Sequence, residues 1–192
     1  MSSITVHIAQ SSDLPKIMEI KTDAYSVRGY CSHTGANEQY LKNRFALVAK
    51  VDNEIIGTMS VMYDQETIPP DEVFPDETAR VRSVSKRVAY YGTFAVKTGM
   101  WRSGTRSIGI ALIREAITRA KADGVDAAVI LVHPRHVRLY RALGFEIVGS
   151  KDEMPGLGKF PVVMLISMGK AWQELLAKNT DVFNTSRTLK CA

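Results

Sequence analysis

Cysteine is scarce in this chain of 192 residues, which contains only Cys31 and Cys191. Two cysteines cannot form the disulfide network that stabilises small secreted domains, so we interpret both as free thiols. Long apolar runs are absent too, because none reaches the roughly 18 to 20 residues that a membrane-spanning helix requires. The opening segment MSSITVHIAQ also lacks the basic, apolar and small-residue parts of a secretory signal. We therefore expect a cytoplasmic protein that does not cross a membrane.

Motifs of several enzyme classes are missing as well. The sequence has no Gly-Lys-Ser/Thr ending of a nucleotide P-loop and no dinucleotide motif G-x-G-x-x-G. The segment GTRSIG has one residue too many for the G-x-S-x-G turn of hydrolases, which argues against Ser107 as a nucleophile. Internal repeats and low-complexity tracts are also absent. These absences argue against the common nucleotide-binding and serine-hydrolase classes.

What is present is an ordinary globular composition. Hydrophobic residues make up 45% and charged residues 23% of the chain, values typical of folded proteins. The length suits one hydrophobic core rather than two. We therefore predict a single domain over residues 1–178 and a C-terminal tail over 179–192. The sequence leaves the oligomeric state open.

The charge is mildly basic and unevenly distributed. The net charge is +5, and residues 97–121 contain six basic residues and one acid. Arg135, Arg138 and Arg141 follow in a stretch without acids. An anionic ligand would bind in this middle part of the chain. Three arginines without a recognition motif do not predict nucleic-acid binding.

Hydrophobic periodicity predicts an α/β order of elements. Residues 4–9 alternate like a half-buried strand, residues 11–25 have helical spacing, and residues 44–64 form a hairpin that turns at Asp52 and Asn53. Gly92, inside a strand at 88–96, predicts a bulge or a close backbone approach. The other predicted elements are a short helix near 36–43, an excursion over 65–87 with one helix near 76–86, a helix at 108–124 ended by Gly124, a strand at 125–133, a short basic helix and a strand within 133–149, a strand at 161–169, and a helix near 170–178. This order predicts a mixed sheet flanked by helices.

The loop before the helix at 108–124 is a candidate phosphate site. Glycines and basic side chains precede a helix there, and exposed backbone amides at a helix N-terminus bind anions. The donors would be backbone amides of residues 104–109, with added charge from Arg102 and Arg106. The candidate cofactor-binding residues here are Arg102, Gly104, Thr105, Arg106, Ser107, Ile108 and Gly109. The alternative is an ordinary helix start with two solvated arginines.

A second stretch, VHPRHVRLYRALGFEIVG, joins an apolar strand to a short helix that carries Tyr140 and ends at Gly144-Phe145. Together with the loop and helix before it, this stretch resembles the GNAT acyltransferase superfamily. More narrowly, DEVFPDE, SKRVAYYGTFAV and HPRHVRLYRALGF look like bacterial N-acyl amino acid synthases, relatives of the autoinducer synthases. The resemblance covers roughly residues 4–169.

The resemblance implies a GNAT fold with a mixed, mostly antiparallel sheet of about seven strands, splayed between strands four and five. It also implies an N-acyltransferase that moves an acetyl or longer acyl group from acyl-CoA to a primary amine of a small molecule or amino acid by direct attack. A backbone amide near Phe94, Ala95 and Val96 would bind the thioester carbonyl, and Tyr140 would protonate the departing thiolate.

Departures from the superfamily pattern keep alternatives open. Superfamily loops usually read Arg/Gln-x-x-Gly-x-Gly/Ala, and of the matching residues Gly104, Ser107 and Gly109 only Gly109 fits. Acyl carrier protein, which presents the same phosphopantetheine arm, is therefore a second candidate donor for a long-chain N-acyl amino acid synthase. A non-catalytic protein of the same fold that binds acyl thioesters is a third reading.

The proton acceptor and the acceptor site are less defined. Related synthases tend to have Glu and Ser on the fourth strand, where this chain has Tyr90 and Gly92. His133 has a suitable intrinsic pKa for the base, and the alternative is that it caps the next helix. With His136 it lacks a further ligand for a metal, so we predict no metal site. Aromatic residues that could line the acceptor site are Tyr25, Tyr30, Tyr90 and Tyr91.

Overall fold

The computed structural model describes residues 4–27, 44–64, 67–99, 105–154, 161–168 and 171–172. These residues group into two compact units. The first takes its described residues from Met1–Val61 and Thr93–Ile117, and the second takes them from Met62–Gly92 and Thr118–Asn179. The helix predicted near 36–43, most of that near 170–178, and the tail lie outside the described residues. The single domain over residues 1–178 stays a prediction.

The strands form one seven-stranded sheet with the order β1-β2-β3-β4-β5-β7-β6. The pairs β1–β2, β5–β7 and β6–β7 are antiparallel, and β4–β5 is parallel. The strand bounds are β1 Thr5–Ile8, β2 Arg44–Val51, β3 Glu54–Tyr63, β4 Val88–Val96, β5 Ala127–Val132, β6 Glu146–Lys151 and β7 Val162–Met168. The predicted mixed, mostly antiparallel sheet is confirmed.

The helices also follow the predicted order, with one addition. Their bounds are α1 Leu14–Ser26, α2 Pro69–Val73, α3 Pro75–Val84, α4 Thr105–Ala122 and α5 Val137–Ala142, with 3-10 turns at Ser11–Asp13 and Pro134–His136. Within the described ranges, no helix is long and apolar enough to cross a membrane.

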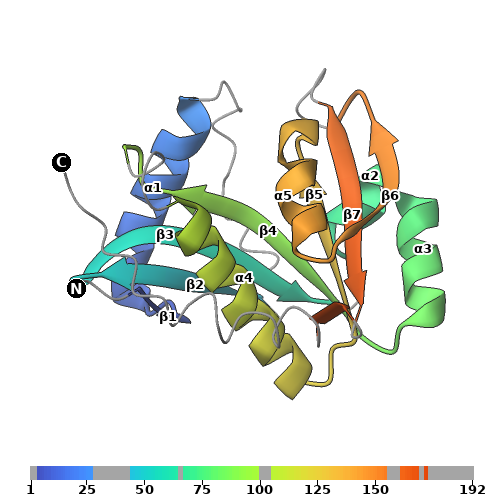
Figure 1. Cartoon of the computed structure of the whole chain (residues 1–192), viewed down its shortest axis with the longest axis horizontal. Coiled ribbons are helices and arrows are strands. Elements are labelled where there is room, and N and C mark those ends of the chain that lie inside the picture. The colour runs from blue at the N-terminus through green and yellow to red at the C-terminus, as the bar shows by residue number, and fades with distance from the viewer. Residues whose placement is uncertain are drawn as a thin grey trace. The chain divides into compact units, whose positions relative to one another are not determined.

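The first unit is built on the β2–β3 hairpin. Its turn has Asp52 at φ 49° and Asn53 at φ 66°, the left-handed pair that a two-residue hairpin requires. Ser60 of β3 contacts α1, whereas Gly57, three residues earlier, lies against α4. Because side chains alternate along a strand, α1 and the first turns of α4 cover opposite faces of this part of the sheet (Figure 1). One apolar cluster of the unit comprises Ile17, Ile20, Ala24, Val48, Ile55 and Ala95.

The start of α1 is tied to β2 by Asp13. Its carboxylate accepts a hydrogen bond from the Gln10 amide at 2.9 Å and from Lys50 Nζ at 3.2 Å. The Gln10 amide, and after it Lys50 and His7, lower the pKa of this carboxyl, whereas its burial acts in the opposite direction. Asp13 therefore links the residues just before α1 to strand β2.

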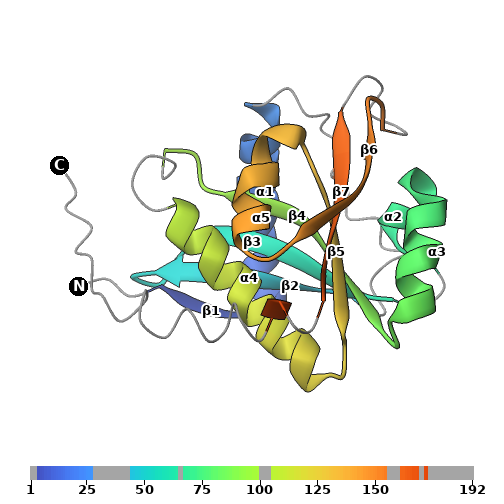
Figure 2. The same ribbon diagram turned by 45° about the vertical axis from the view of Figure 1, so that its right-hand side comes forward.

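The second unit places α5 and the α2–α3 pair on opposite sides of β5, β7 and β6 (Figure 2). The excursion over 65–87 was predicted to contain one helix, and that prediction was wrong because α2 precedes α3. Pro69 and Pro70 occupy the first turn of α2, where a missing amide costs nothing. The Asp71 carboxylate accepts a hydrogen bond from the Ile68 amide at 2.7 Å and so caps this helix.

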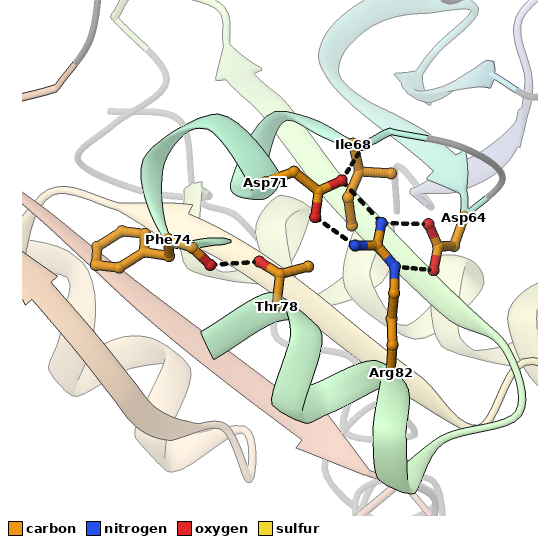
Figure 3. A network of polar contacts seen from close by, with 6 residues as sticks. All are labelled: Asp64, Ile68, Asp71, Phe74, Thr78 and Arg82. Carbon is orange, nitrogen blue, oxygen red and sulfur yellow. Dashed lines mark hydrogen bonds and ion pairs between the residues drawn. The ribbon is translucent and has the colours of Figure 1, made fainter. Parts of the chain in front are cut away.

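Arg82 joins α3 to α2 and to the end of β3. Its guanidinium makes two hydrogen bonds of 2.7 Å to the Asp64 carboxylate and two to Asp71 (Figure 3). The Asp64 and Asp71 side chains are 12% and 19% exposed. Hydrogen bonds to Asp64 and then to Asp71 raise the pKa of Arg82, so the guanidinium stays charged. This bidentate network is the main polar link in the excursion.

Candidate active site

Strand β4 contains a bulge in the region predicted to bind a thioester. The Asp64 amide bonds the Val88 carbonyl and the Lys97 amide bonds the Ile56 carbonyl, each at 2.8 Å. Nine positions separate Val88 from Lys97, but only eight separate Ile56 from Asp64, so β4 has one extra residue. The bulge predicted from Gly92 is therefore confirmed.

The left-handed residue of the bulge is Thr93 rather than its glycine neighbour. Thr93 has φ 45°, a conformation that a β-branched side chain adopts only at a cost. Strain of this kind costs about 1 to 3 kcal/mol and persists only when the surroundings hold it. The contacts around Thr93 must therefore supply that restraint.

The parallel ladder between β4 and β5 is short. It pairs residues 88–91 with residues 127–130, one to one. Among the described residues it does not continue to residues 92–96 of β4, and Leu131 and Val132 of β5 pair with Met164 and Val163 of β7. The ladder is thus incomplete at the place where the resemblance predicted that these two strands separate.

Helix α1 holds the bulge through two side chains one turn apart. Tyr25 Oη donates to the Phe94 carbonyl at 3.1 Å. Lys21, which is 6% exposed, donates from Nζ to Ser60 Oγ at 3.2 Å. Ser60 Oγ in turn lies 2.5 Å from Thr93 Oγ1 in a hydrogen bond. The structure thus gives Tyr25 a defined contact on β4.

The sequence analysis missed Lys21, Ser60 and Thr93. Lysine is almost never fully buried, so Lys21 was not predicted to lie beside Ile20 on the buried face of α1. A usable signal is its spacing, because residues 17, 20, 21 and 24 share one helical face. A lysine within an apolar stripe indicates that polar groups lie opposite it.

Only part of the predicted phosphate site can be described. Helix α4 begins at Thr105, and the backbone of Thr105, Arg106 and Ser107 is helical. Arg102 and Gly104 lie outside the described residues, as does Tyr30. Ile108 is buried, and its side chain fills the space beside Gly57. A Cβ at Gly109 would lie 3.3 Å from the ring of Phe94, so this glycine lets β4 pack closely against α4.

Tyr140 lies on α5 with a buried side chain that is 9% exposed. Its ring meets Phe145 edge to face, with centroids 5.7 Å apart, and Gly144 at φ 83° makes the turn between them. Burial, and to a lesser degree the nearby Tyr90, raise the pKa of Tyr140 to about 12. Its hydroxyl makes no hydrogen bond to another described residue. With this raised pKa the hydroxyl is protonated at neutral pH and can donate a hydrogen bond to a ligand.

Tyr90 and Tyr91 occupy different environments on β4. Tyr90 is half-buried, and its ring lies so close to Gly92 that a Cβ there would be 2.6 Å from Tyr90 Cε1. Tyr91 is 4% exposed, and its hydroxyl has no hydrogen-bond partner within the described part of the chain. Burial raises the pKa of Tyr91. Both tyrosines were predicted to line the acceptor site. Tyr90 lies near Tyr140, whereas Tyr91 is a core residue.

His133 caps the 3-10 turn that follows β5. Its Nδ1 accepts a hydrogen bond from the Arg135 amide at 3.3 Å. Burial, followed by the charge of Arg135, lowers the pKa of His133, so the ring is neutral near pH 7. Arg135 Nε also donates to His136 Nε2 at 3.1 Å. Within the ranges that the structure describes, no three His, Cys, Asp or Glu residues form a metal-binding group.

Comparison with known families and structures gives a consistent result. The family model for N-acyl amino acid synthase FeeM matches residues 16–167. None of the curated proteins matches the sequence of this chain. The structure of FeeM, an N-acyl amino acid synthase from uncultured soil microbes, is similar with a TM-score of 0.79 and 20% identity, over 93% of this chain and 98% of that one.

Acetyltransferases with the GNAT fold are similar as well. A Bacillus subtilis acetyltransferase in complex with CoA has a TM-score of 0.59 and 14% identity, over 86% of this chain and 99% of that one. A spermidine N-acetyltransferase chimera from Vibrio cholerae and hSSAT has a TM-score of 0.61 and 12% identity, over 88% of this chain and 98% of that one. At these identities the likeness shows the fold, which is the GNAT fold that the sequence predicted.

Proposed function

This chain belongs to the N-acyl amino acid synthase FeeM family and is an acyltransferase, and we propose that it moves an acyl group from a pantetheine thioester to the primary amine of a small molecule or amino acid. The observation that carries the proposal is the incomplete β4–β5 ladder beside the bulge at Thr93. Strand amides that no neighbouring strand engages can bond an extended ligand, as an added strand would. A pantetheine arm is a ligand of this shape.

In this proposal, a backbone amide within Phe94, Ala95 and Val96 bonds the thioester carbonyl. It stabilises the negative charge that develops on the oxygen when the amine attacks, an effect often worth a few kcal/mol. The attack is direct, within a complex of both substrates, so catalysis depends largely on holding the two reactants together. No covalent enzyme intermediate is needed.

Tyr140 interacts with the departing thiolate in the proposed mechanism. The thiol of pantetheine has a pKa of about 8.5, like that of a cysteine, so Tyr140 with its pKa of about 12 is the weaker acid. It therefore stabilises the thiolate by donating a hydrogen bond. The net reaction moves one proton from the amine nitrogen to the sulfur.

The group that removes the amine proton is either His133 or water. His133 is neutral, as a base must be, but its Nδ1 already accepts the Arg135 amide. Its other nitrogen carries the proton in that tautomer, so His133 acts as a base only if it gives up the helix cap. A water molecule requires no such change.

The acyl donor is acyl-CoA or acyl carrier protein. The N-terminus of α4, with the backbone amides of Thr105 to Gly109 and the charges of Arg102 and Arg106, suits the diphosphate of coenzyme A. The similar Bacillus subtilis acetyltransferase was solved with CoA. Acyl carrier protein is the alternative, supported by the departures of residues 104–109 from the usual loop pattern. It is also the donor that a long-chain N-acyl amino acid synthase would use.

A matrix of donors and acceptors tests the proposal. Acetyl-CoA, a long-chain acyl-CoA and a long-chain acyl carrier protein are each incubated with amino acids and with polyamines. Product mass and free thiol are then measured. We expect an N-acylated product and one thiol per product for at least one pair. A long-chain product on amino acids only would assign N-acyl amino acid synthase activity, whereas thioester binding without any product would leave the non-catalytic reading.

A further inference from the structure

A chain of hydrogen bonds runs from Lys21 through Ser60 to Thr93, on the β4 bulge. From this placement we infer that it serves catalysis rather than folding. We propose that these three residues, with Tyr25, are positioning residues that hold the bulge so that a backbone amide within Phe94 to Val96 points at the thioester carbonyl. This inference rests on the proposed function. All the residues involved belong to the first unit.

Burial of Lys21 is the first observation behind the proposal. An ammonium group removed from water is unfavourable unless hydrogen bonds compensate it, and an apolar residue would pack against the same core at no such cost. Lys21 is buried on the face that carries Ile17, Ile20 and Ala24. Its Nζ reaches Ser60, which bonds the side chain of the strained residue. The buried ammonium group is thus linked to the bulge through Ser60.

The conformation of Thr93 is the second observation. A glycine at this position would adopt φ 45° without strain, and a glycine stands immediately before it. The bulge alone therefore does not require a threonine. What threonine adds is the hydroxyl that bonds Ser60. Strained residues held by their surroundings are concentrated at functional sites.

The third observation is that side chains of α1 are hydrogen-bonded, directly or through Ser60, to two successive residues of β4. The side chain of Thr93 is bonded through Ser60 to Lys21, and the carbonyl of Phe94 accepts a hydrogen bond from Tyr25. Lys21 and Tyr25 are four residues apart, so they lie one above the other on the helix. The Phe94 carbonyl belongs to the same peptide unit as the Ala95 amide, and Thr93 directly precedes Phe94. A small rotation of that peptide unit would redirect its amide.

Thr93→Gly separates positioning from folding. It removes the strain and the hydroxyl together, so the melting temperature should stay the same or rise while kcat falls. We expect kcat to fall about 10- to 100-fold, as misplacement of a catalytic group by about 1 Å does, with less than about a 3-fold change in KM for the donor. Thr93→Ser keeps the hydroxyl and should retain most of kcat. A merely structural role would move stability and kcat together.

Lys21→Met and Ser60→Ala should lower kcat in the same way, and Tyr25→Phe should do so to a smaller extent. Lys16→Met is the matched control on the same helix. Among the described residues Lys16 hydrogen-bonds Glu19 at the surface, so this substitution should leave kcat unchanged. If Lys21→Met does not fold, the two Thr93 variants still decide. Unchanged kcat in Thr93→Gly overturns this inference alone, whereas a wild-type chain that acylates no amine overturns the proposed function and this inference with it.

Discussion

At the scale of single residues, Tyr140 is the side chain whose removal tests the chemistry most directly. Tyr140→Phe keeps the ring packed on Phe145 and removes only the hydroxyl. We expect turnover with saturating donor to fall about 10- to 1,000-fold, because water can partly replace the hydrogen bond that Tyr140 donates to the thiolate. Tyr63→Phe is the control, because it removes a phenol that bonds Asp123 at 2.6 Å and is not part of the proposed site. Unchanged turnover in Tyr140→Phe would remove this residue from the mechanism.

The residues of the site differ in how far the sequence could predict them. Tyr140 was predicted by resemblance to the acyltransferase superfamily, in which a tyrosine stands four residues before Gly-Phe as Tyr140 does before Gly144, and its catalytic role stays a prediction. Lys21 and Thr93 could not be predicted, since a lysine within an amphipathic helix and a threonine within a strand are ordinary in both places. Their significance comes from a contact between segments about seventy positions apart. Such contacts follow from tertiary packing rather than local pattern.

At the scale of elements, the α2–α3 pair depends on one arginine. Arg82→Ala breaks the bidentate bonds to Asp64 and Asp71, and leaves two mostly buried carboxylates without their cation. The Arg82 side chain is 30% exposed, so we expect a loss of about 1 to 3 kcal/mol in the free energy of unfolding, less than for a fully buried pair. Denaturant titration measures this loss.

Arg80→Ala is the matched control on the same helix. Arg80 is 72% exposed and lies 3.6 Å from Glu77, so its removal should change stability by less than about 0.5 kcal/mol. Arg82→Lys keeps the charge but cannot form both bidentate pairs, so it should fall between wild type and Arg82→Ala. Equal stability of Arg80→Ala and Arg82→Ala would show that the network does not hold the excursion.

The same elements show what local pattern predicts and what it does not. The β2–β3 hairpin was predicted to its turn, because Asp52 and Asn53 tolerate the left-handed backbone that the turn needs. Helix α2 was not predicted, because prolines such as Pro69 and Pro70 usually interrupt helices. Here they occupy the first turn, and the cap comes from Asp71, whose partner Arg82 is eleven residues away. The end of the β4–β5 ladder followed from family resemblance rather than from the pattern of either strand.

At the scale of the whole molecule, the ionisation of tyrosines should make stability fall at high pH. The pKa values of Tyr63, Tyr91 and Tyr140 are all raised, chiefly by burial, and all three belong to the second unit. An unfolded tyrosine ionises near pH 10, before these folded ones do. As pH rises, ionisation therefore lowers the free energy of the unfolded state first. The stability that these tyrosines contribute to the fold is fully present below about pH 10 and is lost as pH rises toward 12 and beyond.

Tyr91→Phe gives this alkaline instability a quantitative test. The Tyr91 hydroxyl is buried without a partner among the described residues, so phenylalanine should leave stability at pH 7 unchanged or slightly higher. Because phenylalanine cannot ionise, the variant should also lose less free energy of unfolding than wild type between pH 8 and 11, measured by denaturant titration at each pH. Amide hydrogen exchange should show that β5 and β7 of the second unit lose protection before the β2–β3 hairpin. Parallel pH curves for the variant and wild type would contradict the assignment of this instability to buried phenols, since the removed hydroxyl would then contribute nothing to it.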